Sequence, residues 1–209
     1  IHNGMNQFPF FYEHGFIYGG IYVLGFCSWL NKKVKENKIE KIIFLARDGD
    51  IYQKVYDSYF AGVKTDYLYW SRFAGLKYLS EYNFQAFIER VVLQKCRKSL
   101  NETIASVIDE FNLSFLYEKL ADYSLNKNDI LNDETKYLFQ SLLVDNWADV
   151  CCIYKKESEI MQKLLLNIIG NTKKIAVVDV GWTGSGPLGV KYFVEKYISD
   201  EIEVYGYLA

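Results

Sequence analysis

The residues best suited to chemistry form one short segment, in which a carboxylate is followed by a turn of glycine and hydroxyl side chains. The segment reads Asp179-Val180-Gly181-Trp182-Thr183-Gly184-Ser185-Gly186. An apolar run over 175–178 precedes it, and Pro187 follows at a position typical of the first residue of a helix. Glycine lets a backbone approach an anion closely, and a helix N-terminus adds amide donors and a positive dipole end. The segment predicts a phosphate-binding loop; the alternative is a strand-to-helix turn whose glycines only relieve crowding.

Charged side chains also follow two other apolar runs that are typical of strands. The sequence Arg47-Asp48-Gly49-Asp50 comes after the run over 42–45, and Ser71-Arg72 comes after the run over 67–70. In an open parallel sheet, ligands bind beyond the carboxyl ends of the strands, near the point where the strand order reverses. We therefore expect these two loops and the glycine-rich loop to meet at one edge of a sheet.

The side chains in these loops suit a polyphosphate bound with magnesium. The guanidinium groups of Arg47 and Arg72 offer forked donors to phosphate oxygens. Mg²⁺ takes one or two carboxylates together with phosphates and water, and Asp48 and Asp179 are the candidate ligands. Surface ion pairs of the two arginines with Asp48 or Asp50 are the alternative interpretation.

The order of the elements that carry these loops predicts an α/β fold with a parallel sheet. The predicted elements are helix 20–36, strand 42–45, helix 51–60, strand 67–70, a helical region to about 170, strand 175–178, helix 187–198 and strand 203–207. We expect an α/β core in residues 1–83 and 171–209, with a helical insertion at 84–170.

Two of the predicted helices have a repeating apolar stripe that indicates which face is buried. In the first helix, the stripe consists of Tyr22, Phe26, Trp29 and Leu30. In the helix after the glycine-rich loop, it consists of Val190, Phe193, Val194 and Tyr197.

Composition describes a globular chain and excludes several classes of partner. A chain of 209 residues with 50% hydrophobic content can bury a full core. The formal net charge of −2 gives no basic field, so we do not expect nucleic acid as a partner. No apolar run reaches the roughly 18 residues that a membrane span needs, so we expect no membrane span. The four cysteines have neither disulfide nor zinc spacing, which favours the cytoplasm. Because the chain begins with Ile1, we expect a piece of a longer protein.

The strand, the acid and the Thr-Gly-Ser-Gly turn resemble the phosphoribosyl pyrophosphate (PRPP) signature of type I phosphoribosyltransferases. In this alignment Asp179 matches the second acid of the signature, and residues 183–186 match the turn that holds the 5-phosphate. Residues 46–49 fall where that family has its pyrophosphate loop, and Arg72 falls where it often has a pyrophosphate-binding arginine. The resemblance implies a sheet of phosphoribosyltransferase type covered by a hood.

The resemblance also implies roles for individual residues. It makes Asp179, Arg47 and Asp48 the candidate catalytic residues. The candidate substrate-binding residues are Gly49, Ser71, Arg72, Gly181, Trp182, Thr183, Gly184, Ser185 and Gly186. Two positions depart from the family pattern, because Val178 replaces the first acid and Trp182 stands where many members have a catalytic acid.

Three motifs across the chain resemble a region of bacterial surface-polysaccharide proteins described as predicted haloacid-dehalogenase (HAD) superfamily hydrolases. They are Phe-Leu-Ala-Arg-Asp-Gly at 44–49, Tyr-Trp-Ser-Arg at 69–72 and Val-Asp-Val-Gly-Trp-Thr-Gly-Ser at 178–185. Together the two resemblances imply a glycosyltransferase that moves 5-phosphoribose from PRPP, with Mg²⁺, to a glycan acceptor of O-antigen or capsule. They also imply a HAD phosphatase domain in the same or a partner chain.

The same resemblances imply the setting of this reaction. The insertion at 84–170 would be the acceptor platform, and the glycan acceptor would be carried on a lipid. A cytoplasmic enzyme would then lie at the inner face of the membrane as part of a larger assembly.

Three other functions compete with this interpretation. The sequence Asp48-Gly49-Asp50 fits a HAD phosphatase with Asp48 as the nucleophile, although Tyr52 occupies the position usual for Thr or Val. A glycosyltransferase would instead depend on a nucleotide sugar. A non-catalytic domain would bind PRPP without turnover, which the missing first acid at Val178 favours.

Overall fold

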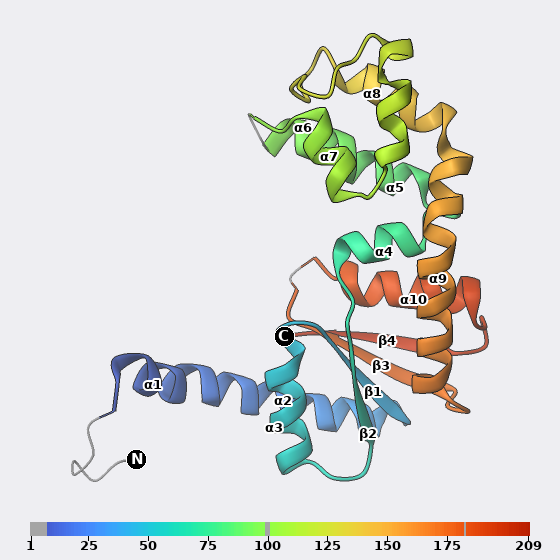
Figure 1. Cartoon of the computed structure of the whole chain (residues 1–209). Coiled ribbons are helices and arrows are strands. Elements are labelled where there is room, and N and C mark those ends of the chain that lie inside the picture. Colours follow the sequence, from blue (N-terminus) through green and yellow to red (C-terminus); the bar gives the residue numbers. More distant parts are fainter. Residues whose placement is uncertain (1–7, 99–100, 182) are drawn as a thin grey trace. The chain divides into compact units, whose positions relative to one another are not determined.

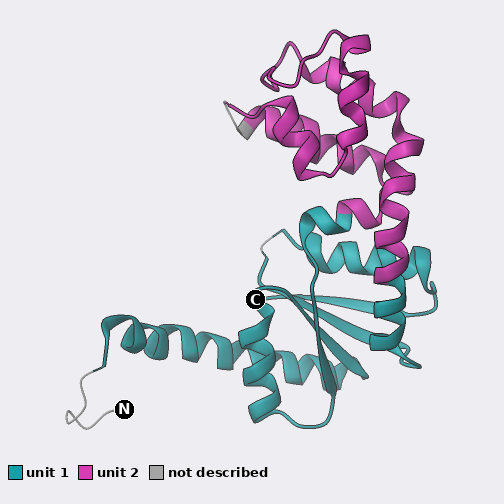
Figure 2. Ribbon diagram, viewed as in Figure 1, with its two compact units in different colours: residues 1–75, 162–209 teal, residues 76–161 magenta. Residues whose placement is uncertain are grey.

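The computed structural model describes residues 8–98, 101–181 and 183–209. The chain divides into two compact units (Figure 2). The first, here called the sheet unit, comprises Ile1–Gly75 and Gln162–Ala209, and the second, the helical unit, comprises Leu76–Met161. The helical unit begins eight residues before the insertion predicted from the sequence. It ends nine residues before the predicted end of that insertion, inside a long helix.

The sheet unit is an α/β fold with a four-stranded, all-parallel sheet, as predicted. Its strands are β1 (Lys41–Leu45), β2 (Lys64–Leu68), β3 (Lys174–Asp179) and β4 (Glu203–Leu208). Their order is β2-β1-β3-β4, and each neighbouring pair is parallel. The two central strands, β1 and β3, are buried almost throughout, which explains their continuous apolar runs.

The strand order reverses between β1 and β3. From β1 the chain passes through α3 (Gly49–Tyr59) to β2, whereas from β3 it passes through α10 (Ser185–Tyr197) to β4 on the other side (Figure 1). Helices α2 (Ile21–Glu36) and α3 pack on the sheet face that carries Ile42 and Phe44. The switch point in the centre of the sheet is where such folds bind ligands.

The buried stripe predicted for α2 was correct for Leu30 and in part for Phe26, which packs against the core, and wrong for Tyr22 and Trp29. The buried residues are Val23, Cys27, Leu30 and Val34, of which only Leu30 was predicted. Tyr22 and Trp29 are exposed, at 58% and 43%. Both stripes have helical spacing, so periodicity alone does not choose between them. The small Val and Cys side chains let α2 approach α3 closely, and the Cys27 thiol donates a hydrogen bond of 3.5 Å to the Tyr52 carbonyl.

The stripe predicted for α10 is confirmed for Val190, Phe193 and Val194, which are fully buried. Tyr197 is only partly buried, and its ring packs on Phe193 with 4.6 Å between ring centroids. Helix α10 begins at Ser185 rather than at Pro187, so the proline is its third residue. Proline is tolerated there because the first amides of a helix have no partner within the helix.

Strand β2 ends earlier than predicted, at Leu68 instead of residue 70. Residues 64–68 pair with β1 over its full length, with Leu68 opposite Leu45, so Tyr69 and Trp70 lie beyond the sheet. Edge strand β2 is less buried than β1, which weakened the apolar signal in its first half.

The helical unit has its own core. Its elements are α5 (Phe84–Ile88), η2 (Glu89–Leu93), α6 (Gln94–Lys98), α7 (Ile104–Glu110), η3 (Ser114–Tyr123), α8 (Lys136–Asp145) and most of α9 (Trp147–Ile169). Phe87, Phe111 and Tyr154 are fully buried there, and the Tyr154 hydroxyl donates to the Phe111 carbonyl at 2.6 Å. A short helix, α4 (Arg72–Tyr78), lies across the division between the units in sequence.

The sheet unit also has an N-terminal helical extension. Helix α1 (Phe10–His14) continues through the π-helical segment η1 (Gly15–Gly20) into α2 (Figure 1). Among the described residues, no helix has the length and apolar character needed to cross a membrane.

Candidate functional site

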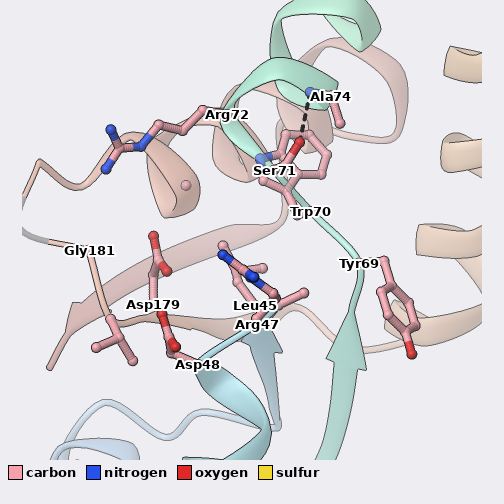
Figure 3. Close-up of a pocket in the computed structure, with 13 residues that line it drawn as sticks. Leu45, Arg47, Asp48, Tyr69, Trp70, Ser71, Arg72, Ala74, Asp179 and Gly181 are labelled. Carbon is pink, nitrogen blue, oxygen red and sulfur yellow. Dashed lines mark hydrogen bonds between the residues drawn. The ribbon is translucent and has the colours of Figure 1, made fainter.

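A pocket of about 470 Å³ opens in the sheet unit at the carboxyl ends of β1 and β3, the switch point of the sheet. Figure 3 shows its charged side chains. The lining residues are Leu45, Ala46, Arg47, Asp48, Tyr69, Trp70, Ser71, Arg72, Ala74, Asp179, Val180, Gly181 and Gly186. The three loops that follow β1, β2 and β3 therefore share one pocket, as the strand pattern predicted.

Asp179 is the last residue of β3 and stands against two glycines. A Cβ atom at Gly186 would lie 2.5 Å from the Asp179 Oδ2 atom and 2.9 Å from Leu45. A Cβ atom at Gly181 would lie 2.8 Å from the same oxygen. Because real Cβ atoms do not approach so closely, glycine at these positions leaves room for the carboxylate.

The environment of Asp179 disfavours its charge. Burial raises the pKa of Asp179 above its ordinary value, and the Asp48 carboxylate raises it further. The Val180 backbone amide and the Arg72 guanidinium act in the opposite direction on this pKa, but burial is the largest effect. A carboxyl group with a raised pKa in a pocket is a functional-site candidate on physical grounds.

The loop after β1 carries Arg47 and Asp48, whose side chains are exposed. The Tyr67 hydroxyl donates a hydrogen bond of 3.2 Å to the Arg47 carbonyl. The loop is further held by the Ala46 amide, which donates to the Leu68 carbonyl at 2.9 Å. The Ala46–Arg47 peptide bond is cis. Both contacts tie the backbone of the loop to β2.

The loop after β2 is anchored by Trp70, which is buried beneath it. A Cβ atom at Gly75 or Gly189 would lie 3.1 Å or 3.3 Å from the Trp70 ring, so this indole packs against glycine backbone. The Ser71 hydroxyl accepts a hydrogen bond of 3.0 Å from the Ala74 amide at the start of α4 (Figure 3). Arg72 begins this helix and reaches over the pocket toward Asp179 (Figure 3).

The loop after β3 ends in the N-terminus of α10. Gly184 adopts the left-handed conformation, with φ +65°, at the N-cap, and no side chain of the described residues caps this helix. The first amides of a helix have no acceptor within it, so those of Ser185 and Gly186 suit an anion. The Thr183 and Ser185 hydroxyls lie 3.2 Å apart.

The structure brings together most of the residues predicted for the site. Those that line the pocket are Arg47, Asp48, Ser71, Arg72, Asp179, Gly181 and Gly186. Thr183, Gly184 and Ser185 do not line it, although they directly precede Gly186. Gly49 does not line the pocket either; it is buried against Phe44, and a Cβ atom added at Gly49 would lie 3.2 Å from the Phe44 backbone. Trp182 lies outside the described residues.

Tyr69 and Trp70 are lining residues that the sequence analysis did not assign to the site. Both were placed inside a strand, whereas they follow Leu68 at the strand end. Tyr69 is 76% exposed and stands across the pocket from Gly181 (Figure 3). A β2 that ends at Leu68, three residues before the polar Ser71, places both residues in the loop.

The carboxylates of the pocket fit one kind of metal site. Asp48 and Asp179 both line it and interact electrostatically. Within the described ranges, no three His, Cys, Asp or Glu residues are grouped as metal ligands. Two carboxylates suit Mg²⁺, which completes its shell with phosphates and water, better than they suit a metal that needs an all-protein cage.

Comparison with protein-family models gave no match, and comparison with curated proteins found no relative of this chain.

The packing of glycine against Asp179 makes a stability prediction. Gly186→Ala should lower the free energy of unfolding by about 1–3 kcal/mol, because the added methyl group overlaps the Asp179 carboxylate and Leu45. Gly25→Ala is the matched control, since Gly25 lies inside helix α2 with nothing within 4 Å of its Cβ position. The control should gain up to about 1 kcal/mol. Urea unfolding measures both, and equal stabilities would contradict the packing described for Asp179.

Proposed function

We propose that this protein transfers the 5-phosphoribosyl group of PRPP to a glycan hydroxyl, with pyrophosphate as the leaving group. The observation that carries the proposal is the shared pocket at the switch point of the sheet. It gathers two guanidinium groups, two carboxylates and the N-terminus of α10. A sugar with a phosphate at one end and a pyrophosphate at the other suits this combination, in which guanidinium and amide groups donate to phosphate oxygens and carboxylates face the sugar hydroxyls or a cation.

The chemistry is a substitution at C1 of the ribose. The bond from C1 to the pyrophosphate oxygen breaks, and its electron pair leaves with pyrophosphate. The acceptor hydroxyl oxygen forms the new bond to C1, and its proton passes to a base, for which Asp48 is the candidate. Bond breaking runs ahead of bond making, through an oxocarbenium-like state similar to that of glycosidases.

Each loop then has a part in the reaction. Arg47 and Arg72 stabilise the charge that develops on pyrophosphate, and the α10 amides hold the 5-phosphate. Asp179 orients the ribose hydroxyls or offsets positive charge at C1. The raised pKa of Asp179 matches a carboxyl group that serves as a hydrogen-bond partner of a sugar.

Asp179 would hold Mg²⁺, and Asp48 either joins it as a second ligand or acts as the base. When bound, this ion neutralises charge on the phosphate oxygens. The sheet of phosphoribosyltransferase type, and the use of the helical unit as a hood and acceptor platform, belong to the same proposal.

One contact counts against the phosphatase alternative. A HAD phosphatase needs both acids of Asp48-Gly49-Asp50 in the reaction centre. Asp50 does not line the pocket, and its carboxylate pairs with Lys54 of α3 at 2.6 Å. Only Asp48 is directed to the pocket, so the pair of acids is divided between two surfaces.

Ligand binding tests the proposal directly. PRPP with Mg²⁺ should raise the melting temperature by several degrees, since a ligand at about 100 times its Kd adds roughly 2.7 kcal/mol to the native state. Nucleotide sugars and free ribose 5-phosphate are the controls and should act less. A larger shift with a nucleotide sugar would support a different glycosyltransferase, and a shift with PRPP without pyrophosphate release on any glycan would support a binding domain.

A further inference from the structure

The N-terminal helical extension carries a dense run of exposed apolar side chains. We call this surface, formed by nine side chains of α1, η1 and the first turn of α2, the aromatic helix surface. Its members are Phe10, Phe11, Tyr12, Phe16, Ile17, Tyr18, Ile21, Tyr22 and Leu24. Their exposed fractions run from 42% to 85%. No residue of α1 or η1 is buried, so this surface belongs to no core of the described chain.

The rings on this surface are arranged in rows along the helix. Phe8 stacks on Tyr12 with 4.7 Å between centroids, and Tyr12 stacks on Phe16 at 6.5 Å. On another side of the helix, His14 packs on Phe10 at 5.3 Å and on Tyr18 at 4.6 Å. Contacts four residues apart hold the rings in place before any partner arrives, which lowers the entropy lost on binding.

The exposed area exceeds what a monomer ordinarily leaves in water. Six of the nine residues are aromatic and three are aliphatic, and large apolar residues carry roughly 150–250 Å² of surface, so the nine together expose about 1,000 Å². The largest apolar patch on a typical monomer is about 300–600 Å², and a standard interface takes about 800 Å² from each partner. Summed over all sides of the helix, the aromatic helix surface therefore reaches the area that one partner contributes to a standard interface.

Charge identifies the kind of partner. Between residues 8 and 31 the sequence has no lysine or arginine, and Glu13 and His14 are its only acidic or imidazole side chains. A helix that lies on a membrane surface normally carries basic residues on its polar face, and this one has none. An uncharged apolar helix is complementary to another of the same composition. We infer that the aromatic helix surface binds the same surface of a second copy of this chain.

An antiparallel, two-fold arrangement suits this pairing. In a parallel pair the two copies of Glu13 would face each other across the apolar contact, whereas an antiparallel pair keeps them apart. Gly15 and Gly19 have nothing within 4 Å of their Cβ positions, so a neighbouring helix can approach the backbone closely between the rings.

The oligomeric state in solution tests this inference. We expect the 209-residue chain to sediment as a dimer in analytical ultracentrifugation over a dilution series. The double substitution Phe11→Lys, Tyr18→Lys should raise the dimer dissociation constant about a hundredfold or more, because exposed aromatic anchors dominate interfaces. The two side chains are 85% and 65% exposed, so the fold should survive, as circular dichroism would show.

Ile160→Lys is the matched control, because Ile160 of α9 is an apolar side chain of similar exposure, 67%, outside this surface. It should leave the dimer intact. A monomeric wild type, or a dimer that persists in the double variant, would overturn the inference. Flotation of the wild type with phosphatidylcholine vesicles would instead assign the surface to a lipid bilayer.

Discussion

Arg47→Ala is expected to reduce turnover of PRPP by about 10²–10³-fold, the loss typical of one preorganised charge donor in an active site. The melting temperature should stay close to that of the wild type, because the Arg47 side chain is exposed and only its backbone carbonyl is tied to Tyr67. Pyrophosphate release in the presence of PRPP, Mg²⁺ and a glycan acceptor measures turnover.

Two further variants separate charge from geometry. Arg47→Lys keeps the positive charge but loses the forked pair of donors, so its rate should lie between those of the wild type and the alanine variant. Arg97→Ala removes an exposed arginine of the helical unit that pairs with Glu89 at 3.6 Å, and should leave the rate unchanged. If Arg47→Ala turned over PRPP at the wild-type rate, Arg47 would have no part in the transfer.

The sequence predicted which three loops meet at the pocket, because the signals for them lie at strand ends. Continuous apolar runs mark β1 and β3, and in a parallel sheet the residues after such runs must share an edge. Arg47, Arg72 and Asp179 were placed together on that basis and line one pocket. A prediction of this kind needs only the strands and their parallel direction, because the carboxyl ends of parallel strands lie at one edge of the sheet.

The details that failed depend on tertiary packing. Two stripes on α2 have helical spacing, so periodicity did not decide which of them is buried. The buried stripe contains Cys27, which contacts the Tyr52 carbonyl of α3, whereas Trp29 is 43% exposed. Strand β2 lies at the sheet edge, and the polar residues in its first half gave no apolar signal there. The apolar Tyr69 and Trp70 extended that signal past Leu68, where the strand ends. The close contact between Gly186 and the Asp179 carboxylate could not be predicted either, because the sequence does not show where the Asp179 side chain points.

Asp179→Asn is expected to stabilise the protein near neutral pH while reducing turnover by about 10²-fold or more. Burial raises the pKa of Asp179 in the folded state above the unfolded value of about 3.9. The folded state therefore holds its proton more tightly, and stability falls as the pH rises through the raised pKa. Asparagine carries no charge, so the variant escapes this loss.

The pH dependence provides the decisive measurement. The stability gained by Asp179→Asn should be largest well above the raised pKa and should disappear as the pH falls below the unfolded value of about 3.9, where both states of the wild type become protonated. Asp122→Asn replaces an exposed aspartate of η3 and serves as the control, with no comparable gain. A gain independent of pH would mean that the amide improves packing rather than removing charge. A stabilised but inactive variant would show that this carboxyl group is retained at a cost to the fold, as expected of a residue that serves the reaction.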